Sequence, residues 1–416
     1  MFSLCCGRRV IALILLVFST RTCLAQLNRS SEPVTLKTYS LQERVNSADI
    51  SPDESLVAIE RTTEHKTADG KTLFSEIVEL WNFREDRVVA AAPLRNVEDR
   101  SVSSERAFDP LKTPRFVRFS GDGKVVVVFV DDSITLLLAS DLGFLRSVII
   151  SVPPSRTRSF VTHKGRGELV NIVVRPELRA MEMSPTGTFL AILWTTGYVG
   201  GRVDFYDIST GQRIAEWDAP PGEMTLGKGH RLAWDLASPT IFVAVPNASP
   251  CGGPTQIPDV IGVDARTGRT KVRFTSGLIV GDIAVTPGHE LLAVENNCVG
   301  VLADHHPRMK VFDLNTGKLA KDVRADGTGV RYAVSASRDG QRAVAWTSDV
   351  RCQFDWLDGH CGDHVIKTML TTWHLPDFSV IASVAVSFPT DSPLRMSSTG
   401  RYVLTYGKTA SVFELP

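Results

Sequence analysis

The sequence predicts an all-β fold, a single β-propeller of about seven four-stranded blades. Two repeated turn patterns predict it, together with the absence of a sustained helical period. The first pattern is a short turn between two apolar runs, and its copies begin at Ser51, Ser120, Ser184, Ser238, Thr286, Ser337 and Ser397. Proline presets φ in such turns, and aspartate or glycine accepts the turn conformation. Each copy therefore indicates a strand, a tight turn and a second strand.

The second pattern is an alternating strand that ends in an acidic residue and a Thr-Gly turn. Its clear copies are VDFYDISTG at 203–211, IGVDARTG at 261–268 and KVFDLNTG at 310–317. Glycine supplies the positive φ, and the aspartate side chain can cap the backbone of the turn. Another strand follows each copy, so the two patterns together predict four antiparallel strands per repeat.

The spacing of the first turn gives the repeat length, because (397 − 51)/6 is about 58 residues. A compact blade needs roughly 40–45 residues. We therefore expect the surplus to form loops, with long inserts at 95–114, 152–176, 246–258 and 349–365. Six or eight blades would also fit this spacing.

Closure of the ring is predicted from the two ends of the chain. After the turn at Ser397 the chain has room for two more strands, near 402–406 and 410–415. The run from Val34 to Leu41 precedes the first repeat and can supply the missing strand. Such closure would leave the ring without an open seam, which is one way that β proteins avoid exposed edges.

These turns resemble those of the WD40-like and YVTN-like bacterial propellers, in which each blade carries a Ser-Pro-Asp-Gly-type turn and an Asp-x-x-Thr-Gly turn. The resemblance covers nearly all of residues 34–416. Its motifs specify architecture far more than activity. The Gly-His and Trp-Asp dipeptides that are typical of WD40 repeats are missing from most of the blades.

The amino end has the pattern of a secretory signal peptide. Arg8 and Arg9 precede an apolar run from Val10 to Phe18, and Cys23-Leu24-Ala25 supplies small residues at a cleavage site. A membrane-spanning helix needs roughly 20 apolar residues, about twice this run. We therefore expect residues 1–25 to be a cleaved signal peptide, residues 26–416 to form the propeller, and the protein to be periplasmic or secreted.

Composition excludes some partners. The whole chain has 46 basic and 46 acidic residues, and loss of the three arginines in residues 1–25 leaves 43 − 46 = −3. Nucleic-acid binding needs an excess of basic residues, so nucleic acid is not expected as a partner. No later apolar run reaches membrane length, so we expect no membrane span after signal removal.

Four cysteines remain after removal of the signal: Cys251, Cys298, Cys352 and Cys361. An even number of cysteines in an exported chain predicts disulfides. Three pairings exist, and local pairing favours Cys352 with Cys361 and Cys251 with Cys298.

A metal site is the alternative for the region of Cys352. The candidate ligands there are Cys352, Asp355, Asp358, His360, Cys361, Asp363 and His364. Their spacing fits no familiar zinc pattern, and oxidised cysteines cannot bind zinc, so we favour the disulfide. The adjacent pair His305-His306 is a weaker candidate, since neighbouring side chains usually point apart.

No catalytic or cofactor motif stands out, so we predict no catalytic residues and no cofactor. The segment 222–229 resembles a phosphate loop, but its last position is Gly229 where Ser or Thr is required. The chain also lacks a Gly-x-Ser-x-Gly elbow.

The leading hypothesis is a non-catalytic, exported propeller scaffold that binds an unknown protein or small ligand through its loop face. The candidate binding loop contains Phe354, Asp355, Trp356, Asp358 and His360, which mix aromatic surface with acceptors as recognition patches do. The aromatic residues could instead pack the loop onto the disulfide. Two other classes stay open: a lyase or oxidoreductase with its active site at the central channel, and a structural component of the cell envelope.

Overall fold

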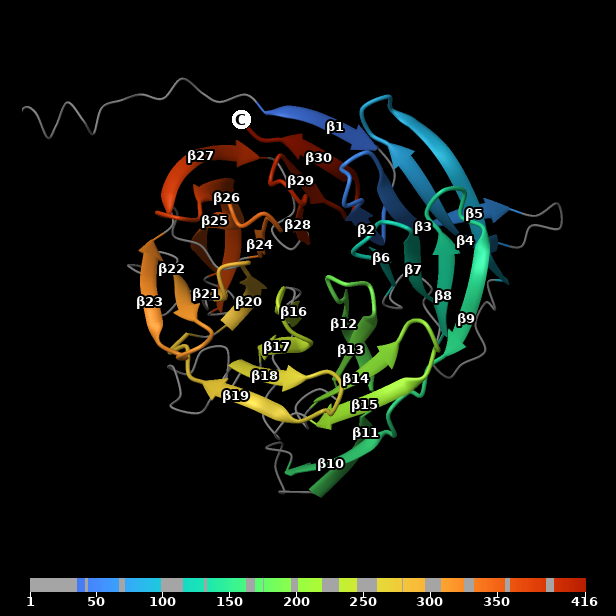
Figure 1. Ribbon diagram of the computed structural model, residues 1–416, viewed down its shortest axis with the longest axis horizontal. Coiled ribbons are helices and arrows are strands. Elements are labelled where there is room, and N and C mark those ends of the chain that lie inside the picture. Colours follow the sequence, from blue (N-terminus) through green and yellow to red (C-terminus); the bar gives the residue numbers. More distant parts are fainter. Residues whose placement is uncertain are drawn as a thin grey trace, which may run out of the picture. The chain divides into compact units, whose positions relative to one another are not determined.

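Seven antiparallel four-stranded sheets follow one another around a common axis in the computed structural model (Figure 1). The structure describes residues 36–41, 44–66, 72–98, 115–130, 133–161, 169–174, 176–195, 201–218, 232–244, 260–278, 280–295, 308–324, 333–355, 360–386 and 393–416. These residues belong to one compact unit, Leu36–Pro416, and no helix occurs among them. The prediction of an all-β propeller is confirmed, and the blades number seven.

The first three blades are built from consecutive strands. Blade 1 contains β2 (Ser47–Ile50), β3 (Val57–Lys66), β4 (Thr72–Asn82) and β5 (Arg87–Glu98). Blade 2 contains β6 (Phe116–Phe119), β7 (Val125–Val130), β8 (Ser133–Leu138) and β9 (Phe144–Ile149). A separate two-stranded ribbon follows, β10 (Arg156–Val161) and β11 (Leu169–Val174). Blade 3 contains β12 (Glu177–Met183), β13 (Phe189–Thr195), β14 (Gly201–Asp207) and β15 (Arg213–Asp218).

The next three blades repeat this arrangement. Blade 4 contains β16 (Leu232–Trp234), β17 (Thr240–Ala244), β18 (Val260–Asp264) and β19 (Thr270–Phe274). Blade 5 contains β20 (Val280–Val285), β21 (Glu290–Glu295), β22 (Arg308–Asp313) and β23 (Leu319–Arg324). Blade 6 contains β24 (Val334–Ala336), β25 (Arg342–Asp355), β26 (His360–His374) and β27 (Ser379–Val386).

Blade 7 joins the two ends of the propeller. It contains β28 (Leu394–Met396), β29 (Tyr402–Thr405), β30 (Ala410–Glu414) and, as its outer strand, β1 (Lys37–Leu41). Strand β1 pairs antiparallel with β30, with Lys37 opposite Glu414 and Leu41 opposite Ala410. The predicted closure by an amino-terminal strand is therefore confirmed, and the strand begins at Lys37.

The core lies between the blades. Alternate side chains of a strand point to opposite faces of its sheet, so each blade packs one face against the blade before it and one against the blade after it. Seven clusters of buried apolar side chains result, each shared by two consecutive blades. The innermost strands of neighbouring blades also contact one another all the way round, including β28 with β2.

The repeated turns form as their sequence predicts. The Ser120 hydroxyl donates to Asp122 Oδ1 (2.7 Å) and accepts the Val125 N–H (2.9 Å), and Ser337 makes equivalent bonds in blade 6. In blade 4 the turn begins earlier than predicted, at Asp235, whose N–H donates to the Thr240 carbonyl. The Thr-Gly turns are capped by aspartates, as at Asp313, whose Oδ1 accepts the N–H groups of Asn315 and Thr316.

Two kinds of connection distinguish the two faces of the ring. Turns between the first and second strands, and between the third and fourth, have four to six residues. They lie on one face of the ring, which we call the short-turn face. Connections between the second and third strands, and between blades, leave from the opposite face, here the long-connection face. They include the segments 99–115, 219–231, 245–259 and 296–307.

The expectation that the surplus residues form loops is wrong for two of the four predicted inserts, 152–176 and 349–365, whereas 246–258 and most of 95–114 lie outside the described residues. The segment 349–365 lies largely in strands, because β25 and β26 continue well beyond the other strands of blade 6. The segment 152–176 contains the β10–β11 ribbon, and β5 extends to Glu98. Pairing into ribbons satisfies backbone N–H and C=O groups that a loop would leave to solvent.

Candidate functional site

The central channel gathers charged side chains from four consecutive blades. Each innermost strand places a side chain at an equivalent level, two residues before the first residue of its short turn. Around the ring from blade 1 to blade 7, this level is occupied by Asp49, Arg118, Glu182, Ala233, Ala284, Ser335 and Arg395. The charged residues therefore occupy blades 7, 1, 2 and 3, and small residues occupy blades 4, 5 and 6.

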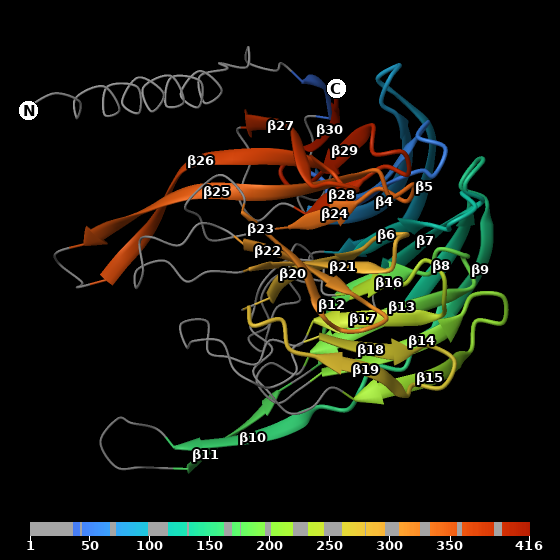
Figure 2. The same ribbon diagram turned by 60° about the vertical axis from the view of Figure 1, so that its left-hand side comes forward.

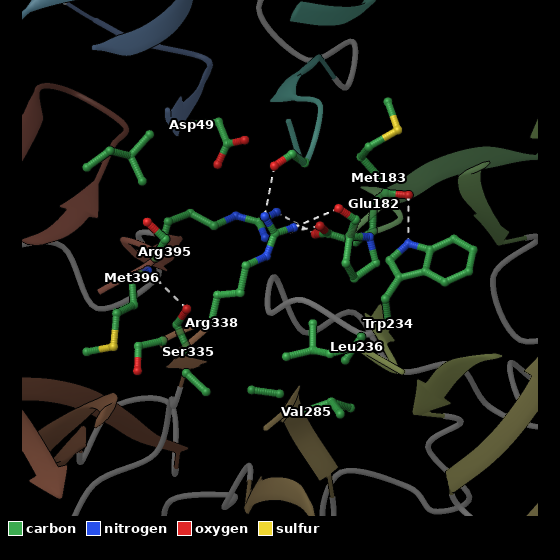
Figure 3. A pocket seen from close by; sticks show the side chains of 18 of the residues that line it. Asp49, Glu182, Met183, Trp234, Leu236, Val285, Ser335, Arg338, Arg395 and Met396 are labelled. Carbon is green, nitrogen blue, oxygen red and sulfur yellow. Dashed lines mark hydrogen bonds and ion pairs between the residues drawn. The ribbon is translucent and has the colours of Figure 1, made fainter. Parts of the chain in front are cut away.

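An ion pair spans the channel between blades 7 and 3. Arg395 Nη1 donates to Glu182 Oε2 (3.1 Å), and Arg395 Nη2 donates to Glu182 Oε1. Arg118 of blade 2 also reaches Glu182, with Nη2 3.5 Å from Oε1, and donates from Nη1 to the Val117 carbonyl (2.7 Å). Glu182 thus balances two guanidinium groups, and Figure 3 shows its contact with that of Arg395.

Two aspartates, the half-buried Asp49 and the fully buried Asp282, hold neighbouring blades together. Asp49 Oδ2 accepts the N–H of Phe119 in the next blade (2.9 Å), and Asp282 Oδ2 accepts the N–H of Val334 in the next blade (2.9 Å). Burial raises the pKa of Asp49, although Arg118 and Arg395 oppose the shift. Burial likewise raises the pKa of Asp282 well above its usual range.

Arg338 crosses the mouth of the channel on the short-turn face. It extends from the turn of blade 6 and donates from Nη1 to the Gly121 carbonyl (2.9 Å) and from Nη2 to the Pro185 carbonyl (3.0 Å). The turns of blades 2 and 3 approach each other closely there, since a Cβ on Gly121 would lie 1.7 Å from the Pro185 oxygen. Partial desolvation of the guanidinium group lowers the pKa of Arg338, while the nearby Asp49 acts to raise it.

A cavity of about 240 Å³ lies along this axis, and residues of all seven blades line it. Asp49, Glu182, Arg338 and Arg395 form its charged side, and Trp234, Leu236 and Val285 lie on its apolar side (Figure 3). The indole N–H of Trp234 donates to the Glu182 carbonyl (3.0 Å). The described lining residues offer guanidinium groups, carboxylates and apolar surface, a combination suited to holding a small charged molecule.

A second buried polar cluster lies between blades 1 and 2. Arg115 contacts Glu76 and has its Nε 3.4 Å from Glu60 Oε1, and both carboxylates are fully buried. Asn46 donates to Glu60 Oε1 (3.3 Å) and to Thr62 Oγ1 (2.9 Å). Burial raises the pKa of Glu60 to about 8, against the pull of Arg115 and Asn46, and the Glu76 carboxylate adds to the rise.

The long-connection face carries two projecting ribbons. In blade 6, β24 pairs with β25 only at 343–345 and β27 pairs with β26 only at 368–374. Beyond the opposite pair Asp349 and Lys367, the two strands pair only with each other, out to Asp355 opposite His360. Figure 2 shows this β25–β26 ribbon and the β10–β11 ribbon extending from the same side of the blades, away from the turn between β14 and β15.

The predicted binding loop falls on the end of the β25–β26 ribbon. Phe354, Asp355 and His360 lie in its strands, whereas Trp356 and Asp358 lie outside the described residues. The structure does not describe the side chains of this segment, so its role in binding stays a prediction.

The predicted disulfides also stay predictions. Cys352 lies opposite Asp363 and Cys361 lies opposite Phe354, which places the two cysteines on paired strands, two positions apart in register. Cys251 and Cys298 lie outside the described residues. No group of three or more His, Cys, Asp or Glu residues that could hold a metal ion occurs in the described part of the chain, which leaves out the side chains of the alternative site near Cys352.

Sequence reasoning missed the charged channel residues, although a signal for them exists. Each lies two residues before the first residue of a short turn, as Glu182 does before Ser184. Aligning the seven turns and reading back two positions gives all four charged residues. A single sequence cannot show that Arg395 reaches Glu182, because 213 residues separate them.

No family model matches this chain, and no curated protein is similar to it. The fold therefore defines the class of the protein, a seven-bladed β-propeller. No helix among the described residues is long and apolar enough to cross a membrane.

Proposed function

We propose that this protein is an exported scaffold of the WD40-like or YVTN-like type, which binds a partner protein through its long-connection face. The observation that carries the proposal is the β25–β26 ribbon, which extends past every other strand of its blade. The rigid ring behind it is a suitable base, since binding residues are often held on loops by a rigid scaffold.

A ribbon of this kind contributes little to the stability of the ring. An isolated two-stranded hairpin is marginally stable in water, and ordering its residues costs conformational entropy. Residues 350–355 nevertheless continue the pairing with residues 360–365, and the β10–β11 ribbon projects from the same face. Two ribbons that project from one face of the ring favour that face as a binding surface for a partner protein.

Export and disulfides are part of the proposal. The signal-like amino end and the even number of later cysteines support both. A bond between Cys352 and Cys361 would join the two strands of the ribbon near its end and would limit its motion. The aromatic and acidic residues at 354–360 would then lie at the end of a rigid ribbon.

Removal of the ribbon tests the proposal. Residues 350–366 are replaced by Asn-Gly, which joins the opposite residues Asp349 and Lys367 by a two-residue hairpin turn. We expect the shortened protein to keep its melting temperature and to lose capture of its partner from an envelope extract. The double variant Trp356→Ala with Asp358→Ala should have the same effect.

A matched control lies on the other face. Arg266 is exposed in the turn between β18 and β19, and Lys318 lies in the turn between β22 and β23. The variant Arg266→Gln with Lys318→Gln should capture the partner as the parent does. If the protein with the shortened ribbon captures the partner as well as the parent does, the proposal is wrong.

A further inference from the structure

Arg338 is the charged residue of the channel whose charge is least well balanced. Within the described part of the chain, its hydrogen bonds go to two main-chain carbonyls and to no carboxylate. Arg395 and Arg118, by contrast, both pair with Glu182. A guanidinium group binds a carboxylate or phosphate by two parallel charge-assisted hydrogen bonds, which are roughly twice as strong as bonds to neutral acceptors.

The carboxylates of the cavity already bond to groups other than Arg338. Two guanidinium groups, of Arg338 and Arg395, and two carboxylates, of Asp49 and Glu182, line the cavity. Glu182 is held by two of the arginines, and Asp49 accepts the Phe119 N–H. Arg338, which is exposed at the mouth, is therefore the guanidinium group of the lining that hydrogen-bonds to no carboxylate among the described residues.

The opposite side of the cavity is apolar. Trp234, Leu236 and Val285 line it (Figure 3), and the small residues Ala233 and Ala284 also belong to the lining. The volume of about 240 Å³ lies below the roughly 300–1,000 Å³ of sites for drug-sized ligands. A molecule that fits must be small, with a charged end near Arg338 and a short apolar body.

We propose that the channel binds a small oxyanion with a short apolar body, whose carboxylate or phosphate group pairs with Arg338. The anion replaces the Gly121 and Pro185 carbonyls as the acceptor of the Arg338 guanidinium. The apolar body lies against Leu236 and Val285, away from the Arg395–Glu182 ion pair. This site is on the face opposite the ribbons and does not depend on the proposed partner binding.

Calorimetric titration with matched small molecules tests the site. Butyrate, butyl phosphate and butyramide share an apolar chain but differ in the end group, and inorganic phosphate lacks the chain. At constant ionic strength set with chloride, we expect butyrate or butyl phosphate to bind, butyramide not to bind, and inorganic phosphate to bind more weakly. Whichever of butyrate and butyl phosphate binds with the higher affinity identifies the anionic group that the site prefers.

Substitution of Arg338 is the second arm. Arg338→Met removes the charge and keeps the length, and affinity should fall at least about tenfold, the consequence of losing charge-assisted hydrogen bonds. Arg338→Lys keeps a charge without the two parallel donors and should bind with intermediate affinity. Arg266→Met removes an exposed arginine on the same face, outside the channel, and should bind like the parent.

The outcomes distinguish a role of Arg338 in anion binding from a purely structural role. If Arg338→Met melts at a much lower temperature, its affinity is set aside, and the Arg338→Lys variant and the comparison of butyrate with butyramide decide. The proposal is overturned if none of the anions binds the parent at millimolar concentration. It is also overturned if butyramide binds as well as butyrate, or if a folded Arg338→Met variant retains the parent affinity.

Discussion

Glu54 of blade 1 accepts two hydrogen bonds from Thr399 of blade 7. The backbone N–H of Thr399 lies 2.8 Å from Glu54 Oε1, and its hydroxyl lies 2.7 Å from the same oxygen. Ser398 adds a bond from its hydroxyl to the Pro52 carbonyl (2.5 Å). The ring is thus closed twice, by β1 at its outer edge and by these turns near its axis.

Substitution of Glu54 tests the inner closure. Glu54→Ala removes an acceptor that is 7% exposed and leaves the Thr399 donors without it, so we expect a loss of about 1–3 kcal/mol in urea unfolding. Glu54 has a φ of 62°, and the equivalent position in blade 7 is Gly400 at 71°. Glu54→Gly should therefore lose less stability than Glu54→Ala. The opposite order would mean that backbone strain at Glu54 is unimportant.

Deletion of β1 tests the outer closure. The strand covers β30, and the Tyr39 ring packs edge-on against Phe83 with 5.3 Å between centroids. A protein that begins at Arg44 should melt at a lower temperature or aggregate, because it exposes the edge of β30. Tyr39→Phe keeps the ring contact and serves as the control. An unchanged melting curve for the truncated protein would show that β1 is not needed for closure.

The architecture could be predicted because local turn chemistry repeats. Proline, serine, aspartate and glycine specify each turn within six residues, and seven copies give the blade number. The sequence of the blade 6 ribbon also contains a local strand pattern, which the prediction of loops from the repeat length did not take into account. Val350, Cys352 and Phe354 alternate with Arg351, Gln353 and Asp355, a period of two that is typical of a strand.

The channel could not be predicted in the same way. Its central pair joins residues of blades 7 and 3, and Arg338 reaches blades 2 and 3 from blade 6. Such contacts depend on how the ring brings its innermost strands together. Sequence gives the identity of these residues, but their distances follow only from the closed fold.

Gly121 permits the close contact between the turns of blades 2 and 3. A Cβ there would lie 1.7 Å from the Pro185 oxygen, which belongs to rigid backbone. Gly121→Ala should therefore destabilise the protein by about 1–3 kcal/mol, as overpacking does. Gly288 in the turn of blade 5 is the control, because a Cβ there would meet only Thr286 Oγ1 at 3.6 Å. Equal urea midpoints for the two alanine variants would contradict the role given to Gly121.

The cysteines give a test that combines export and ribbon structure. Protein made in an oxidising compartment and mapped as peptides without reduction should show Cys352 joined to Cys361 and Cys251 joined to Cys298. The first pair lies on paired strands of the ribbon. Four free thiols, or bound zinc, would contradict the disulfide prediction. Reduction of the first bond should loosen the ribbon while the seven inter-blade cores keep the ring folded.

The buried cluster around Glu60 predicts that stability falls as pH rises. Burial raises the pKa of Glu60 from 4.5 to about 8, so between these values the folded state binds more protons than the unfolded state. The stabilising contribution is thus complete below about pH 4.5 and is lost as pH rises toward 8. Glu60→Gln keeps the site uncharged, and its unfolding free energy in urea, relative to the parent, should increase from pH 5 to pH 8. Arg115, Glu76 and Asn46 surround Glu60 in both proteins, so a constant difference across this range would show that Glu60 does not titrate there.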